Sequence, residues 1–208
     1  MKKLKSTLPN MAIVLTSIAV IAGLALGYVN SITAEPIKQI KEQQLADGIK
    51  AVLAADELKV EEPVALDNGA VLYRTDKGVA VQATDPNGFG GKLTVLVGFN
   101  DEGLIQGYQV LETSETPGLG AKAGDWFQKG QKGDIIGKQA GKLTVTKDGG
   151  EVDAITASTI TSRAFLRCVN AAYEALDSQK EDAQTGASRL TPDPSLSARG
   201  ADTEQETE

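Results

Sequence analysis

The sequence of 208 residues predicts an α+β protein, in which an N-terminal transmembrane helix precedes an antiparallel sheet with flanking helices. Three features carry this prediction. Residues 11–29 form an uncharged apolar run, short β-rich segments follow between residues 70 and 112, and residues 162–177 repeat apolar side chains at helical spacing. The remaining core of about 130–150 residues is large enough to bury a hydrophobic centre of its own.

The apolar run MAIVLTSIAVIAGLALGYV is the predicted transmembrane helix. At about 1.5 Å per residue, its 19 residues span roughly 28 Å, close to the thickness of bilayer hydrocarbon. Three lysines within residues 1–10 are the only charged residues before Glu35. This distribution predicts a single-pass protein of the inner (cytoplasmic) membrane, with a cytoplasmic N-terminus and the remaining chain on the periplasmic or outer face.

A cleaved signal peptide is the alternative interpretation of this run. Its apolar region would normally cover about 7–15 residues and end at a small-x-small cleavage site. The observed run is longer, and the nearest candidate site, Ile32-Thr33-Ala34, begins with a large residue. A retained membrane helix is therefore favoured.

Residues 30–69 are expected to form a membrane-proximal helix and a linker. Within residues 36–55, apolar side chains recur mainly at three- and four-residue spacing, which predicts an amphipathic helix that continues from the membrane. These side chains are Ile37, Ile40, Leu45, Ile49, Val52 and Leu53. Residues 56–63 are mostly charged and are expected to form a loop.

Residues 70–178 are expected to form the folded domain. Turn clusters rich in Gly, Asn and Asp separate four predicted strands, and this spacing indicates an antiparallel meander. The strands are Ala70–Thr75, Gly78–Thr84, Gly91–Phe99 and Leu104–Glu112. Further predictions are an irregular segment at Ser114–Ala123, a short helix at Asp125–Lys129 and a strand at Lys142–Lys147.

The last predicted element of the domain is a helix at Ser162–Asp177. One face carries apolar side chains at helical spacing. They are Phe165, Cys168, Val169, Ala172 and Leu176. Residues 179–208 are polar and acidic, with almost no large apolar side chains, and are predicted to be a disordered acidic tail.

Composition excludes several kinds of chemistry. The chain has no histidine and one cysteine, so it has no histidine-based catalytic triad, no zinc site built on thiolate or imidazole and no cysteine-ligated iron–sulfur cluster. We therefore predict no metal site and no catalytic residue, and any redox carrier must be organic. The net charge of −7 argues against a nucleic-acid partner, because phosphate binding requires a basic face.

A cluster of hydroxyl side chains immediately precedes the last predicted helix. Its members are Thr156, Ser158, Thr159, Thr161 and Ser162. A helix N-terminus offers unpaired N–H donors and the positive end of a dipole, so a phosphate group is stabilised there. The alternative is a Thr-rich strand that runs into the helix, with Thr161 or Ser162 as its N-cap.

The segment DAITASTITS at residues 153–162 resembles the flavinylation motif of FMN-binding domains. Such domains occur in the G subunit of the Rnf ferredoxin:NAD oxidoreductase and the C subunit of the sodium-pumping NADH:quinone reductase. The family motif is Asp-x-x-(Ser/Thr)-Gly-Ala-(Thr/Ser), and its last hydroxyl forms a phosphoester with FMN. Aligned with it, Asp153 matches the Asp, Thr156 the first hydroxyl and Thr159 the modified residue. The resemblance thus implies covalent FMN at Thr159.

Two positions depart from the usual motif. Ala157 stands where Gly is usual, and an alanine is acceptable there provided that its φ is negative. Ser158 stands where Ala is usual and places a competing hydroxyl beside Thr159.

A second segment, ETPGLGA at residues 115–121, resembles a loop of the same family. The resemblance implies that Glu115 and Thr116 hydrogen-bond the flavin edge or its ribityl chain. Gly118 allows the backbone to approach a flat ring closely, and Leu119 covers the ring face. Taken alone, the segment could equally be a Gly/Pro connection between strands.

The resemblance implies an electron-relay subunit of a membrane-bound, ion-translocating Rnf complex. Its implied partners are the other subunits of that complex and, during maturation, a flavin transferase that uses FAD. The compact length and the Ala157/Ser158 variant favour this interpretation over the C subunit of the sodium-translocating NADH:quinone reductase. A cofactor-free, membrane-tethered interaction subunit is an alternative of another class. A stand-alone flavin reductase is disfavoured, because no second cofactor motif is visible.

Several other residues receive structural interpretations. Trp126, Phe127 and Cys168 are expected in the core, and residues 88–91 (GFGG) in a tight turn. Arg163 lies one turn into the predicted helix, where either a phosphate contact or a surface ion pair is consistent with the sequence.

Overall fold

The computed structural model describes residues 8–55, 57–66 and 68–189. The chain divides into two compact units between Asp47 and Gly48, which are described separately. The first unit consists of helix α1 (Leu8–Val52) up to Asp47, and the last turn of this helix belongs to the second unit.

Helix α1 has 45 residues and contains the whole predicted membrane segment. It continues through Pro36 without interruption, as the predicted amphipathic extension requires. Large apolar side chains between Met11 and Val29 are exposed. Among the described residues, α1 is the helix whose length and composition suffice to cross a membrane. The expected N-terminal apolar helix is thus confirmed, while the predicted basic segment falls mainly outside the described residues.

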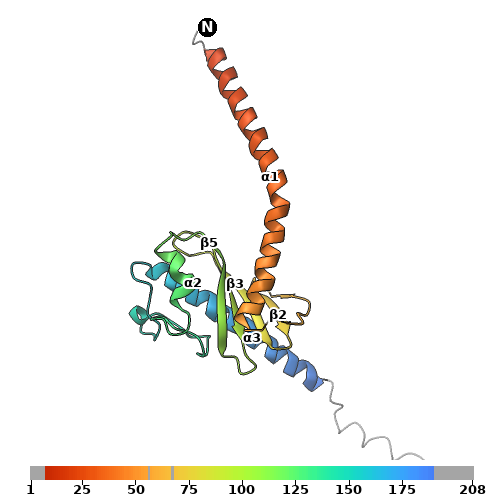
Figure 1. The fold of residues 1–208 in the computed structure, drawn as a ribbon, viewed down its shortest axis with the longest axis vertical. Coiled ribbons are helices and arrows are strands. Elements are labelled where there is room, and N and C mark those ends of the chain that lie inside the picture. The colour runs from red at the N-terminus through yellow and green to blue at the C-terminus, as the bar shows by residue number, and fades with distance from the viewer. Residues whose placement is uncertain (1–7, 56, 67, 190–208) are drawn as a thin grey trace, which may run out of the picture. The chain divides into compact units, whose positions relative to one another are not determined.

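The second unit contains a five-stranded antiparallel sheet with the order β1-β2-β3-β4-β5, of which Figure 1 labels β2, β3 and β5. Its strands are β1 (Val64–Ala65), β2 (Val71–Thr75), β3 (Gly78–Asp85), β4 (Leu93–Phe99) and β5 (Ile105–Thr113). The α+β class and the antiparallel meander are therefore confirmed. The short edge strand β1 was not expected from the sequence, where residues 30–69 were assigned to a helix and linker.

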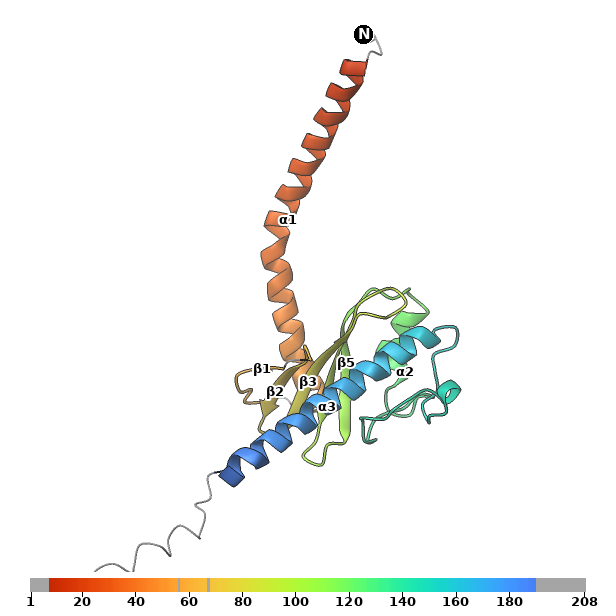
Figure 2. The same cartoon turned by 180° about the vertical axis from the view of Figure 1, so that it is seen from behind.

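Strand β4 is buried along its whole length because both faces of the sheet are covered. On one face, Leu93, Val95, Val97 and Phe99 belong to the main hydrophobic core. Helix α3 (Thr159–Arg189) crosses this face, as Figure 2 shows, and contributes Phe165 and other apolar residues. The predicted apolar face of this helix thus forms the core.

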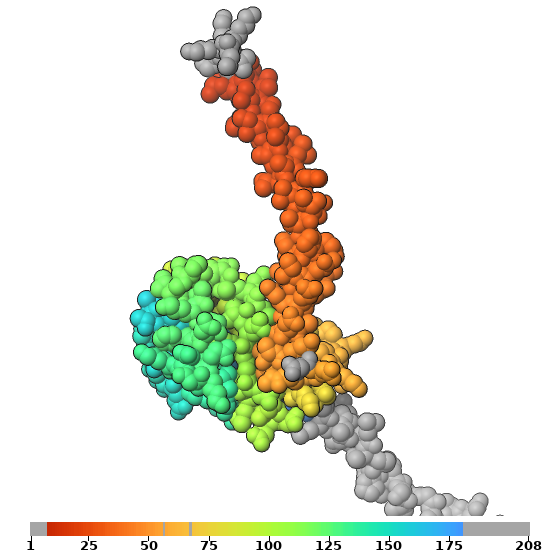
Figure 3. All heavy atoms as spheres, viewed as in Figure 1, coloured from red at the N-terminus to blue at the C-terminus, as the bar shows by residue number. Residues whose placement is uncertain are grey.

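The opposite face is covered by the last turn of α1, which packs on a pair of glycines. Gly98 and Gly107 are direct partners on β4 and β5, and both α-carbons lie against Val52. A Cβ on Gly98 would overlap the Val52 carbonyl oxygen and lie 3.0 Å from the Val52 Cβ. The close approach therefore requires glycine. In Figure 3 these orange helix residues lie against the yellow-green atoms of β5.

The connection from β5 to α3 is described throughout, and it contains three short helices and no strand. They are η1 (Gly120–Lys122), α2 (Ala123–Trp126) and η2 (Thr146–Asp148). The predicted short helix is thus present, but it ends at Trp126 instead of the expected Lys129, and η1 precedes it within the segment expected to be irregular.

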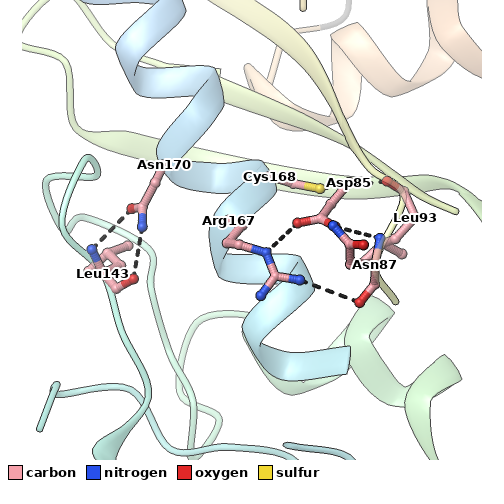
Figure 4. Close-up of polar contacts among 7 residues, drawn as sticks. All are labelled: Asp85, Asn87, Leu93, Leu143, Arg167, Cys168 and Asn170. Carbon is pink, nitrogen blue, oxygen red and sulfur yellow. Dashed lines mark hydrogen bonds and ion pairs between the residues drawn. The ribbon is translucent and has the colours of Figure 1, made fainter. Parts of the chain in front are cut away.

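The strand predicted at Lys142–Lys147 is wrong, because a side chain replaces the neighbouring strand. The Asn170 amide accepts N–H groups from Gly141 (3.1 Å) and Leu143 (3.0 Å) and donates to the Leu143 carbonyl (2.9 Å). Figure 4 shows the Asn170–Leu143 contacts. These bonds satisfy the backbone of Gly141 and Leu143, while Val145 forms only one isolated bridge, with Val152, so no strand results.

Helix α3 begins at Thr159 and continues to Arg189, past the expected end at Asp177. Residues 179–189 were predicted to be disordered, and the structure instead places them in the helix. Most of them are good helix formers, such as Gln, Lys, Glu and Ala, which accounts for the extension. The rest of the predicted acidic tail, residues 190–208, lies outside the described residues.

The glycine pair generates a stability prediction. We expect Gly98→Ala to lower the free energy of unfolding by about 2 kcal/mol, because the added methyl overlaps the α1 backbone. The measurement is denaturant unfolding of the full chain in detergent, followed by Trp126 fluorescence. Gly124→Ala is the control, since a Cβ there meets nothing within 4 Å. Equal losses for both variants would contradict the proposed close packing.

Candidate functional site

The two motif segments, far apart in the sequence, meet at one pocket of about 340 Å³. The pocket lies where the start of α3 faces the loop after β5 and the turn after β3. Its lining residues are Phe89, Glu115, Thr116, Leu119, Gly120, Ala157, Ser158, Thr159, Ile160 and Thr161.

Most residues predicted for the site line this pocket. They are Glu115, Thr116, Leu119, Ser158, Thr159 and Thr161. Gly118 and Thr156 are exposed and do not belong to the lining, although Gly118 has a φ of 78° that favours glycine in the loop.

Sequence reasoning missed several residues of the pocket and its edge. Phe89 was interpreted only as part of a turn, yet it lines the pocket with its side chain 70% exposed. An aromatic residue within a glycine-rich turn was the available signal. Gly120 and Ile160 also line the pocket. In addition, Lys147 contacts Thr159, and no local sequence pattern indicated this contact.

The start of α3 is fixed by Ser162, whose side chain is fully buried. Its hydroxyl donates to the Ser158 carbonyl (2.9 Å) and accepts the Ile155 N–H (2.9 Å). The helix itself begins at Thr159, so Thr161 and Ser162 lie in its first turn. The alternative in which Thr161 or Ser162 caps the helix is therefore wrong, and Ser162 instead ties the preceding turn to the helix.

Ala157 adopts a φ of 62°, in the left-handed region. The sequence-based condition for an alanine at this position, a negative φ, is therefore not met. A Cβ in this region costs about 1–2 kcal/mol relative to the ordinary helical region. The position thus has a backbone conformation that glycine adopts without strain.

Thr161 provides a direct test of whether the pocket suits a polar ligand. Its Oγ1 is buried and has no hydrogen-bond partner among the described residues. A Cβ on Gly120 would lie 2.7 Å from this oxygen and would overlap Glu115 Oε2. A buried hydroxyl without a partner is costly, and a ligand group that bonds to it removes that cost. The pocket therefore fits a ligand with polar groups.

The turn that carries Phe89 is held at both ends. Glu115 Oε1 accepts the Phe89 N–H at 2.8 Å. At the other end, Asp85 accepts hydrogen bonds from the Arg167 guanidinium and, at 2.6 Å, from the Asn87 N–H (Figure 4). Glu115 is predicted from the family motif to contact a ligand, and the structure gives it this additional role in positioning the turn.

Asp85 carries a perturbed pKa because of its surroundings. Its burial raises the pKa, but hydrogen bonds and the charge of Arg167, together with the Asn87 N–H, outweigh burial and hold the pKa below its usual value. The carboxylate is therefore ionised and ties β3 to α3 near the pocket.

Two cationic side chains, Arg163 and Lys147, lie near the start of α3, and each has a different partner. Arg163 forms a bidentate ion pair with Asp148, at 2.7 Å from Nε and 2.6 Å from Nη2. Of the two sequence interpretations for Arg163, the structure thus has the surface ion pair. Lys147 Nζ donates to Thr159 Oγ1 at 3.0 Å. A positive charge and a helix N-terminus therefore meet at the Thr159 hydroxyl.

Aromatic side chains of the core pack against Phe165 of α3, the helix whose start forms part of the site. Phe127 stacks on Phe165 with ring centroids 4.2 Å apart, and Tyr108 meets Phe165 edge-on at 4.8 Å. The Tyr108 hydroxyl accepts the Phe127 N–H and donates to the Ala123 carbonyl, and burial raises its pKa. The core prediction for Phe127 is confirmed.

Trp126 and Cys168 also have structural roles. Trp126 is half-buried and donates from Nε1 to the Asp153 carbonyl at 2.8 Å, which steadies the start of the hydroxyl-rich segment. Cys168 is 1% exposed, and burial raises the pKa of its thiol to about 12. Figure 4 shows this thiol projecting from α3, and its Sγ lies 3.6 Å from the Leu93 carbonyl oxygen.

The pocket offers a hydroxyl that contacts a cation, helix N–H donors and an apolar rim of Phe89, Leu119 and Ile160. Within the described residues, no group of three or more His, Cys, Asp or Glu side chains could hold a metal ion. The arrangement suits a ligand with an anionic end and a flat apolar end.

Comparison with known proteins defines the class of this domain. Residues 88–174 match the family model of the FMN-binding domain, and this range contains the residues that line the pocket together with strands β4 and β5.

The chain also resembles named relatives. It is 33% identical over 190 residues to the G subunit of the Na(+)-translocating ferredoxin:NAD(+) oxidoreductase complex of Acetobacterium woodii, with 77% of this chain and 87% of the relative covered. It is 32% identical over 179 residues to the G subunit of the ion-translocating oxidoreductase complex of Cronobacter sakazakii, with 75% and 85% covered. The chain belongs to the family of G subunits of ion-translocating oxidoreductase complexes.

Coverage differs among these relatives. The corresponding G subunit of Erwinia tasmaniensis is 38% identical over 102 residues, which cover 46% of this chain and 49% of that relative. The chain thus matches about half the length of this relative and most of the length of the two others.

The left-handed conformation of Ala157 generates a prediction that a substitution to glycine stabilises the protein. We expect Ala157→Gly to raise the free energy of unfolding by about 1 kcal/mol, because glycine adopts the left-handed conformation without a steric penalty. The control is Ala51→Gly, at an exposed position in the last turn of α1 where the backbone is helical, and this substitution should not raise the free energy of unfolding. Denaturant unfolding measures both changes, and destabilisation by Ala157→Gly would contradict the observed φ.

The Asp85–Arg167 ion pair generates a pH prediction. The pKa of Asp85 is lower in the folded chain than in the unfolded chain, where it is about 3.9. Its stabilisation is therefore complete above that pH and is lost as the pH falls through the folded-state pKa. We expect Asp85→Asn to lower the free energy of unfolding at neutral pH by about 2 kcal/mol and to weaken its acid dependence.

Unfolding of the chain at several pH values below neutrality tests this expectation. Glu151→Gln, at an exposed carboxylate, is the control and should leave the profile unchanged. An acid dependence of Asp85→Asn identical to that of the unaltered chain would show that this ion pair does not contribute.

Proposed function

We propose that this chain is an electron-relay subunit of a membrane-bound, ion-translocating oxidoreductase complex of the Rnf type, with FMN joined to Thr159 through a phosphoester. The observation that carries the proposal is the meeting of both family motifs at one pocket, with the Thr159 hydroxyl in its wall at the start of α3. The match to the FMN-binding domain supports the identity of the cofactor.

The residues of the pocket suit the parts of FMN. The first N–H groups of α3, the unpartnered Thr161 hydroxyl and the Lys147 ammonium are suited to the phosphate and the polar chain. Phe89 and Leu119 present exposed apolar surface for the flat ring. Glu115 Oε2 and Thr116 remain the proposed polar contacts for the flavin edge or ribityl chain. Bound FMN accepts and donates one or two electrons.

Attachment requires one covalent step, which a flavin transferase performs with FAD. The Thr159 oxygen forms a bond to the phosphorus of the FMN moiety, the bond from that phosphorus to AMP breaks, and AMP leaves. A base of the transferase takes the Thr159 hydroxyl proton. Asp153 and Thr156 are exposed beside the pocket and are available for recognition by the transferase.

A covalent linkage suits the proposed location. We place α1 across the inner membrane with the basic N-terminus in the cytoplasm and the FMN domain on the outer face. An ester prevents loss of the cofactor on the side where free FMN is not supplied. The phosphoester keeps one negative charge, about −1, which the start of α3 and Lys147 can balance.

The names of the relatives support the Rnf-type assignment over a C subunit of the sodium-translocating NADH:quinone reductase. The relatives reported above are named as G subunits, and the one from Acetobacterium woodii is named for ferredoxin and NAD(+). The proposed partners are accordingly the other membrane and iron–sulfur subunits of such a complex.

Thr159 is the residue on which this proposal is tested. With the transferase co-expressed, we expect Thr159→Val to abolish the fluorescent flavin band of the chain on a denaturing gel, because valine has no oxygen to esterify. Mass spectrometry of the unaltered chain should show an increment of FMN minus water on the peptide that contains Thr159. Thr84→Val, at an exposed threonine outside the pocket, is the control and should retain the band.

The position of the increment separates the remaining possibilities. Ser158→Ala should keep the band if Thr159 is the acceptor. A band that persists in Thr159→Val would move the linkage to another hydroxyl, and an unmodified, colourless native subunit would refute the relay function and support the cofactor-free alternative.

A further inference from the structure

We propose that Lys147 is a positioning residue that selects Thr159 as the flavin acceptor and then pairs with the charge of the phosphoester. The inference rests on the proposed function, but it concerns a residue outside both family motifs. It derives from one contact, the 3.0 Å hydrogen bond from Lys147 Nζ to Thr159 Oγ1.

The contact distinguishes Thr159 from its neighbours. Residues 156–162 contain five hydroxyl groups, and within the described chain only that of Thr159 receives a hydrogen bond from a cationic side chain. Ser162 Oγ bonds backbone groups, Thr161 Oγ1 is buried without a partner, and Ser158 is 8% exposed. The Lys147 ammonium thus contacts the Thr159 oxygen and none of the other four hydroxyl oxygens of this segment.

The position of Lys147 is set by an ion pair on the same turn. Lys147 lies in the middle of η2, and the next residue, Asp148, accepts two hydrogen bonds from Arg163. Arg163 lies one turn beyond Thr159 on α3, so the pair holds η2 against the start of the helix. Gly149 follows with a φ of 83°, which lets the chain turn away directly after this contact.

The distribution of charge explains why the lysine is needed. The Arg163 charge is committed to Asp148, and the buried Glu115 carboxylate lines the same pocket. Lys147 is therefore the cation that contacts the acceptor oxygen, and it supplies a positive charge beside that oxygen. A hydrogen bond that involves a charged group is stronger than a neutral one and orients its partner. Lys147 therefore keeps the Thr159 oxygen at the pocket and attracts the incoming phosphate.

The test measures the rate of attachment. Full-length chain in detergent is incubated with limiting transferase and FAD, and the modified fraction of the Thr159 peptide is followed by mass spectrometry. We expect Lys147→Met to lower the initial rate about tenfold, equivalent to about 1.4 kcal/mol. Lys147→Arg should restore most of the rate, because it retains the charge.

Lys142→Met is the matched control, an exposed lysine in the same connection that does not line this pocket, and should react at the unaltered rate. All unmodified variants should share one thermal unfolding midpoint. An unaltered rate for Lys147→Met would overturn the proposal. So would a lowered midpoint together with a slow Lys147→Arg, since this indicates a structural role. If the unaltered chain takes up no FMN, the proposed function itself fails.

Discussion

The geometry of the site depends on two hydrogen bonds of one buried hydroxyl. Ser162 accepts the Ile155 N–H and donates to the Ser158 carbonyl, and so ties the segment before α3 to the first turn of the helix. Between these attachments the chain makes a tight turn that the Ser158 N–H closes on the Ile155 carbonyl (3.0 Å), and Ala157 adopts the left-handed conformation within this turn. The same turn places Thr159 at the helix start, where backbone N–H groups and the helix dipole favour an anion. The position of the Thr159 hydroxyl and the local strain at Ala157 therefore belong to the same turn.

The rest of the domain presents this turn to the pocket. The apolar face of α3 packs on β3 and β4, and the pair of Asp85 with Arg167 fixes the beginning of the turn that carries Phe89. Glu115 reaches the same turn from the loop after β5. Three segments distant in sequence are thus held around a single cavity, and each of them is held by a polar contact in addition to the core.

Local periodicity predicted the N-terminal apolar helix, strands β2 to β5 and α3, because each has an apolar pattern long enough to be recognised. The hydroxyl cluster and the ETPGLG segment predicted which loops contribute to the site. Features that depend on distant contacts were not predictable. Asn170 supplies the hydrogen bonds that replace the expected strand at residues 142–147, and Lys147 reaches Thr159 from a turn that no sequence pattern marks. The φ of Ala157 likewise belongs to a turn that the Ile155 and Ser158 backbones close and that Ser162 ties to the helix, and alanine itself does not favour it.

The burial of Cys168 has a chemical consequence for the proposed role of this chain in electron transfer. Reduced flavins can pass electrons to oxygen, and the resulting oxidants attack accessible thiolates first. The only sulfhydryl of this chain lies under α3, stays protonated and contacts the Leu93 carbonyl. The domain is consequently poor in targets for peroxide and cannot cross-link to a neighbour through sulfur while it is folded. This protection of the thiol is a property of the packing of α3 on the sheet.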